Sequence, residues 1–174
     1  MKQGRLLFLG DSHPANFNWQ ERITHFEVLN LSIFGETAQG LLKRLPSLPE
    51  QVCDPHIILI ITGTNNLLKE DYNYAETLRQ IVVHLSHTYP AAEIIINSLI
   101  PLQIPGLNKE EMKRINSEME ALSLQSGCCF LDIFSKFDTR SELFQADGIH
   151  FTETGYNLWA RSILEYIAFL LEDD

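Results

Sequence analysis

The stretch HIILIITG, residues 56–63, is a nearly uninterrupted run of large aliphatic side chains that ends in threonine and glycine. A run of this length and composition indicates a strand that is buried on both faces, as strands of parallel sheets are. Four further short apolar runs occur along the chain: RLLFLG (5–10), HFEVLNLSI (25–33), EIIINSLI (93–100) and GCCFLDIF (127–134). The sequence therefore predicts a central parallel sheet.

Segments with helical spacing separate these runs. Apolar residues recur at intervals of three and four in residues 37–45, 73–89, 108–126 and 152–173. Asn108 and Thr152 precede acidic residues, as helix N-caps do. Strands that alternate with helices through right-handed crossovers form a three-layer α/β/α sandwich. We therefore predict an α/β fold in one domain that spans residues 1–174.

The formal net charge of −10 at neutral pH opposes binding to nucleic acids and to anionic membranes. A neutral small molecule is a more compatible partner, and the sequence does not indicate an oligomeric state. No segment approaches the roughly 20 apolar residues that span a bilayer, and the N-terminal apolar run is too short for a secretory signal. We therefore expect a cytoplasmic protein without integral membrane association.

Cysteines and late aromatic residues are assigned to the core. Cys53, Cys128 and Cys129 are odd in number, and two are adjacent, so they predict neither a disulfide framework nor a zinc site. We expect all three to be buried thiols. Helical spacing also assigns three aromatic residues of the last helix to the core, namely Trp159, Tyr166 and Phe169.

Polar and glycine-containing motifs follow the strands. They are Gly10-Asp11-Ser12, Gly35 within NLSIFGET (30–37), TGTNN (62–66) and DGIH (147–150), the last in a long loop after the fifth strand. The carboxyl ends of parallel strands share one edge of a sheet, and ligands of open α/β sheets bind there. We therefore expect the chemistry of this protein at that edge.

These motifs contain the parts of an acyl-transfer site. A serine hydroxyl is a weak nucleophile until a base takes its proton, and His150 oriented by Asp147 could activate Ser12. Such a site also needs hydrogen-bond donors for the oxyanion. The backbone N–H groups of Ser12 and Gly35 and the side-chain amide of Asn65 are the candidates.

The blocks FLGDS, NLSIFG, GTNN and DGIHFTETGY resemble, in the same order, the four signature blocks of the SGNH hydrolases, also called the GDSL esterase and lipase family. The resemblance implies a flavodoxin-like fold with a five-stranded parallel sheet in the order 2-1-3-4-5. It also implies ester or thioester hydrolysis through an acyl-serine intermediate, without a metal or an organic cofactor. Ser12 matches the family's nucleophile, Gly35 and Asn65 its oxyanion donors, and Asp147 and His150 its acid–base pair.

Three residues depart from the family pattern. His13 and Pro14 follow the serine where the family has leucine and its successor, and Asn66 stands where the third block commonly has aspartate. We expect Asp11 to bind backbone amides and hold the turn that presents Ser12, and Asn66 to cap or brace a turn. We also expect unusual backbone angles at Gly10 and Gly35.

Apolar residues in the two long loops, 101–108 and 135–151, are candidates for the pocket wall. They are Leu102, Ile104, Phe144 and Phe151. The sequence as a whole predicts a serine esterase for short acyl chains, with a small-molecule ester as its substrate. Three alternatives remain open: a non-catalytic binding module on the same fold, a lysophospholipase and a thioesterase.

Overall fold

Five parallel strands form one sheet in the order β2-β1-β3-β4-β5. The computed structural model describes residues 3–172. The strands are β1 (Arg5–Gly10), β2 (Glu27–Asn30), β3 (Ile57–Ile61), β4 (Glu93–Asn97) and β5 (Cys129–Leu131). Both the parallel sheet and the strand order that the resemblance implied are thereby confirmed.

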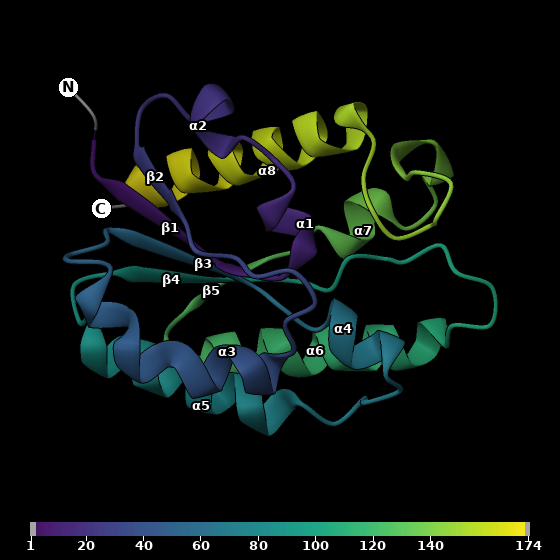
Figure 1. The fold of residues 1–174 in the computed structure, drawn as a ribbon, viewed down its shortest axis with the longest axis horizontal. Coiled ribbons are helices and arrows are strands. Elements are labelled where there is room, and N and C mark those ends of the chain that lie inside the picture. The colour runs from purple at the N-terminus through teal and green to yellow at the C-terminus, as the bar shows by residue number, and fades with distance from the viewer. Residues whose placement is uncertain (1–2, 173–174) are drawn as a thin grey trace.

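Helices cover both faces of this sheet (Figure 1). One layer contains α3 (Ala38–Arg44), α5 (Ala75–Thr88) and α6 (Lys109–Ser126), and the other contains α2 (Trp19–Arg22) and α8 (Glu153–Glu172). The 3-10 helices η1 (Leu45–Glu50) and η2 (Ser141–Leu143) lie in connections. This arrangement is the predicted three-layer sandwich. No helix among residues 3–172 has the length and apolar character to cross a membrane.

Short helices follow three of the strands at the carboxyl edge. They are α1 (Ser12–Ala15) after β1, α4 (Thr64–Leu68) after β3 and α7 (Phe134–Phe137) after β5. Figure 1 shows all three at the same end of the sheet, away from the two chain termini. The motifs that follow the strands in sequence therefore gather at one end of the molecule.

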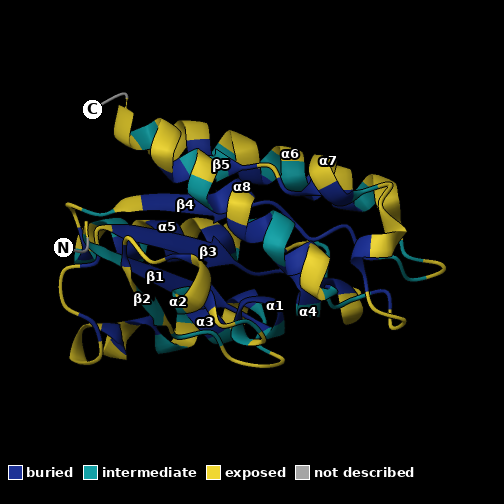
Figure 2. Cartoon of the chain, turned by 90° about the horizontal axis from the view of Figure 1, so that it is seen from above, coloured by how far each residue is buried: buried dark blue, intermediate teal, exposed yellow. Residues whose placement is uncertain are grey.

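The core lies along the central strands. All five residues of β3 are buried, as are Leu6–Leu9 of β1 (Figure 2). Removing one such side chain from water contributes about 1.5–3 kcal/mol to folding. The edge strand β2 is only partly buried. The loops at the carboxyl ends of the central strands are therefore attached to buried strands.

Both predicted helix caps are confirmed. The Asn108 side chain accepts hydrogen bonds from the backbone N–H groups of Glu110 and Glu111. The Thr152 hydroxyl accepts one from the N–H of Gly155. These bonds satisfy donors that the first turn of a helix cannot pair internally.

Two assignments to the core need correction. Trp159 is fully buried, but Tyr166 is half-buried and Phe169 is 59% exposed. Because a helix turns 100° per residue, Phe169 points away from the face that buries Ile167 two residues earlier.

The prediction that all three cysteines are buried is also wrong. Cys53 lies in the connection before β3 and is exposed, and Cys128 and Cys129, at the edge strand, are only partly buried.

Candidate active site

Ser12 and His150 meet at the carboxyl edge although 138 residues separate them in sequence. Ser12 is the first residue of α1, directly after the turn that ends β1. Its Oγ lies 3.0 Å from Nε2 of His150. This is hydrogen-bond distance, and it is the geometry that a base needs to take the hydroxyl proton.

Asp147 orients the His150 ring. Its Oδ2 lies 2.7 Å from Nδ1 of His150, and its Oδ1 accepts the backbone N–H groups of Ile149 and His150. Partial burial opposes ionisation of this carboxyl, but these three hydrogen bonds outweigh it and lower its pKa to about 2. The carboxylate therefore holds the proton of His150 on Nδ1 and leaves Nε2 free to accept from Ser12.

Asp11 holds the turn before Ser12, as expected. Its Oδ1 accepts the backbone N–H of His13 at 3.0 Å, which caps α1. The expectation for Gly10 is wrong: its φ is not positive, and glycine is needed there because a Cβ would lie 2.3 Å from the carbonyl oxygen of Ile61. The constraint at Gly10 is therefore close packing against β3 and not an unusual backbone angle.

The carbonyl groups of α1 are anchored by side chains from three other segments. The Tyr156 hydroxyl donates to the carbonyl of His13. The Pro14 carbonyl accepts from the indole N–H of Trp19 and from the side-chain amide of Asn30. A short helix has few internal hydrogen bonds, so these contacts fix the position of the residue it presents, Ser12.

Three of the four predicted pocket residues belong to the core instead. Phe151, Leu102 and Phe144 are at most 7% exposed, and Ile104 packs against the core from a partly buried position. The Phe151 ring contacts those of Phe137, Phe144, Tyr156 and Trp159. The loop residues Phe144 and Phe151 are therefore part of the core, and Phe151 directly follows the DGIH segment.

Gly35 has the unusual backbone angle expected of it, with φ at +74°. A Cβ at this position would meet nothing within 4 Å. Within residues 3–172, neither the Ser12 N–H nor the Gly35 N–H donates a hydrogen bond to another group. Both candidate oxyanion donors are therefore available to a ligand.

Asn65 and Asn66 connect the segment after β3 to the segment after β2. Asn65 donates from Nδ2 to the carbonyl of Glu36, 3.1 Å away. Asn66 is buried, accepts the N–H of Ala38 and donates to Gln39 and Asp71. Asn66 is thus the brace that the sequence predicted, and it holds the start of α3 beside the loop that contains Gly35.

An ion pair between Arg44 and Glu36 stabilises the loop that contains Gly35. Both guanidinium nitrogens of Arg44 that face Glu36 bind its carboxylate, at 2.7 and 2.9 Å, and Arg44 also donates to the carbonyl of Leu31. Such two-point contacts fix orientation as well as distance. The loop from Leu31 to Glu36 is therefore held at both of its ends.

The sequence analysis missed an exposed apolar rim on this loop, formed by Ile33 and Phe34. These side chains are 47% and 64% exposed and immediately precede Gly35. Because they lie beside the candidate oxyanion donor Gly35, these side chains are candidates for contact with a ligand. The sequence showed two large apolar residues directly before a turn glycine, but Ile33 was included in the apolar run 25–33, whereas β2 ends at Asn30.

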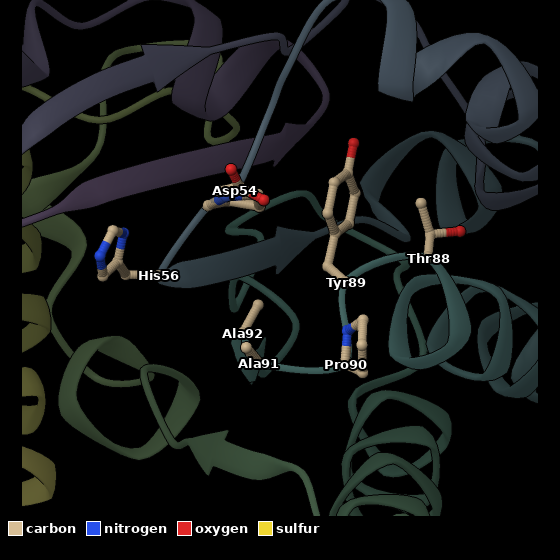
Figure 3. A pocket seen from close by; sticks show the side chains of 8 residues that line it. Asp54, His56, Thr88, Tyr89, Pro90, Ala91 and Ala92 are labelled. Carbon is tan, nitrogen blue, oxygen red and sulfur yellow. The ribbon is translucent and has the colours of Figure 1, made fainter.

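The cavity in Figure 3 lies at the opposite edge of the sheet. It measures about 230 Å³ and is lined by residues that precede β3 and β4, among them Asp54, His56 and Tyr89. None of the polar residues around Ser12 lines it. In the described part of the chain, no three His, Cys, Asp or Glu side chains lie close enough together to hold a metal ion.

The fold and the arrangement around Ser12 define a hydrolase of the SGNH type. The model of the GDSL-like lipase/acylhydrolase family matches residues 8–158, so the chain belongs to that family. The recognition made from the four sequence blocks is therefore confirmed, and membership of this acylhydrolase family makes the protein an ester-hydrolysing enzyme.

Relatives and solved structures agree with this assignment. The chain is 27% identical over 184 residues to the platelet-activating factor acetylhydrolase IB subunit alpha1 of Bos taurus, covering 99% of this chain and 79% of the relative. Its fold resembles a putative platelet activating factor from Streptococcus pneumonia (21% identity, TM-score 0.81, 95% and 84% covered). It also resembles the esterase EstA from Pseudoalteromonas sp. (22% identity, TM-score 0.81, 98% and 100% covered).

Proposed function

We propose that this protein hydrolyses carboxylic esters with short acyl chains through an acyl-serine intermediate at Ser12. One observation carries the proposal: Ser12, His150 and Asp147 form a continuous hydrogen-bonded chain with distances of 3.0 and 2.7 Å. A serine, a histidine and a carboxylate joined in this order are the parts that nucleophilic acyl transfer requires.

The reaction begins when His150 takes the proton of the Ser12 hydroxyl and the oxygen attacks the ester carbonyl. Asp147 remains ionised and stabilises the imidazolium that forms. The negative charge on the carbonyl oxygen is stabilised by the Ser12 N–H, the Gly35 N–H and the second N–H of the Asn65 amide. His150 then gives its proton to the leaving alcohol, which breaks the ester bond and leaves an acyl-serine.

Hydrolysis of the acyl-serine uses the same groups. His150 takes a proton from water, and the hydroxide attacks the acyl carbon. The proton then returns to Ser12 as the carboxylic acid leaves. This cycle requires no metal and no organic cofactor. Two features support a short acyl group: the relatives bear the name of acetylhydrolases, and Leu102, Phe144 and Phe151 of the long loops are in the core, where they cannot line an acyl tunnel.

The test combines turnover with covalent labelling. The wild-type protein is expected to hydrolyse chromogenic esters, fastest for acetyl and propionyl groups, and to react with a fluorophosphonate probe at Ser12. Ser12→Ala is expected to lose ester turnover and probe labelling. It should unfold at the same urea concentration as the wild-type protein. The exposed Ser47 provides the matched control, since Ser47→Ala leaves the site intact. Equal turnover by Ser12→Ala would falsify the proposal, and an unreactive wild-type Ser12 would favour a binding module.

A further inference from the structure

His13, the residue that replaces leucine after the serine, is completely buried beside the candidate site. Its Nε2 lies 2.7 Å from the backbone carbonyl oxygen of Ile149, and its Nδ1 lies 3.3 Å from Oδ1 of Asp11. The His13 ring also stacks on the His150 ring, with centroids 5.4 Å apart and planes 29° apart. No step of the reaction described above uses this side chain.

Both nitrogens of the His13 ring face acceptors. A carbonyl oxygen can only accept, so Nε2 of His13 carries a proton and donates it to Ile149, while Nδ1 faces a carboxyl oxygen of Asp11. Asp11 is 1% exposed, and its Oδ2 has no hydrogen-bond partner among the described residues. The His13 ring thus lies between a buried carboxyl group on one side and the acid–base loop on the other.

The contact to Ile149 acts directly on the candidate base. The carbonyl of Ile149 and the N–H of His150 belong to the same peptide group, which is planar and rigid. His13 binds the carbonyl end of this group at 2.7 Å, and Asp147 binds its N–H end at 3.0 Å. The two hydrogen bonds fix the plane from which the His150 side chain projects toward Ser12.

We propose that His13, held between Asp11 and Ile149, is a positioning residue that fixes the Ile149–His150 peptide and thereby keeps Nε2 of His150 within reach of Ser12. Its side chain joins the nucleophile turn to the backbone of the acid–base loop, across 136 residues of sequence. The inference rests on the proposed function, because its effect on turnover presupposes that Ser12 and His150 act as nucleophile and base.

Three variants test this role. His13→Leu restores the family's residue and removes the donor to Ile149. His13→Gln keeps a side-chain N–H that can reach the same carbonyl. Asp11→Asn/His13→Leu also removes the buried carboxyl group that His13→Leu leaves facing an apolar side chain, so it replaces the single variant if that variant fails to fold. Unfolding in urea and circular dichroism establish which variants are folded.

The expected result is a loss confined to the chemical step. Because misplacement of a catalytic group by about 1 Å can cost about 100-fold, kcat of the folded leucine variant should fall about 10- to 100-fold, with KM within about twofold. His13→Gln should recover at least about half of that loss on a logarithmic scale. A purely structural role would not predict rescue by glutamine. The proposal is overturned if kcat of the folded leucine variant stays within about threefold of wild type, or if glutamine is no better than leucine.

A second measurement separates this inference from the proposed function. Nitrogen-15 spectra of the histidine side chains in the wild-type protein should show a proton on Nε2 of His13, as the contact with the Ile149 carbonyl requires. A His13 ring without a proton on Nε2 would refute that hydrogen bond and with it the positioning role. If the wild-type protein neither turns over esters nor reacts with the fluorophosphonate, the proposed function fails. The His150 ring-proton signals of the wild-type, glutamine and leucine proteins then decide whether His13 positions that ring.

Discussion

The side-chain amide of Asn65 donates a hydrogen bond to the backbone carbonyl of Glu36, one residue after Gly35. This bond uses one of the two N–H groups of the amide and fixes the direction of the other. It therefore joins two candidate oxyanion donors, from loops 30 residues apart in sequence, into one unit. A prearranged set of donors stabilises a developing charge without reorganising during the reaction.

Replacing Asn65 by alanine should affect the chemical step. Loss of one oxyanion donor commonly lowers kcat by about 100- to 1000-fold, and we expect a loss in this range with KM within about threefold. Steady-state kinetics with an acetyl ester measures both constants. A loss of kcat smaller than about threefold would remove Asn65 from the oxyanion site.

Asn66→Ala should act mainly on stability. The variant leaves the N–H of Ala38 buried without its acceptor, and an unpaired buried group costs about 1–3 kcal/mol. The free energy of unfolding in urea should fall by about that amount, and kcat should fall less than in Asn65→Ala. Asn73→Ala, at an exposed position two residues beyond Asp71, serves as the control and should change stability by less than about 0.5 kcal/mol. Equal stabilities of the two variants would contradict the bracing role.

The stability that Asp147 contributes should depend on pH. The folded pKa of about 2 lies below the value of 3.8 for a free aspartate, so its interactions stabilise the protein fully above the unfolded value. As pH falls from that value toward 2, the carboxyl gains a proton and this contribution is lost. The difference in unfolding free energy between wild type and Asp147→Asn should thus be constant above about pH 5 and shrink below about pH 4. A difference that grows on acidification would contradict the lowered pKa of Asp147.

Phe34 should influence which acyl-chain lengths the protein hydrolyses best. It is 64% exposed beside Gly35, where space for a ligand is open, and Phe34→Ala would remove apolar contact area from the rim. One buried methylene contributes about 0.8 kcal/mol, so kcat/KM should fall several-fold for butyryl and longer esters, and less for acetyl esters. Phe169→Ala is the matched control, because that phenylalanine is similarly exposed on α8, outside the candidate site. Identical chain-length profiles for both variants would exclude the rim from substrate binding.

The sequence predicted the sheet because the central strands are buried on both faces and must be apolar throughout. The residues of β1 and β3 alone indicate this, and the parallel arrangement then brings the ends of the strands together. Ser12, Gly35 and Asn65 come shortly after strands, so the sequence also predicted that they lie at the carboxyl edge of the sheet. Asp147 and His150 lie in a long loop, so no strand end indicated their position; the chemistry that Ser12 requires suggested them, and the resemblance to a family matched them.

Pocket and core could not be told apart by sequence. Phe151 and Phe34 are both large apolar residues beside a polar motif, yet one is 1% and the other 64% exposed. The difference depends on whether another element packs above the residue, which the local pattern does not report. The contact of His13 was equally hidden, because its partner is a backbone carbonyl, and every residue has one.

The hydrogen bond from Tyr156 of α8 to the carbonyl of His13 has a consequence for the order of folding. It joins residues 143 positions apart, and the contact of Ser12 with His150 joins residues 138 positions apart. Contacts this distant in sequence form late in folding, since the chain between them must first be ordered. We therefore expect the surroundings of Ser12 to assemble only after the strands and helices between these residues have packed together.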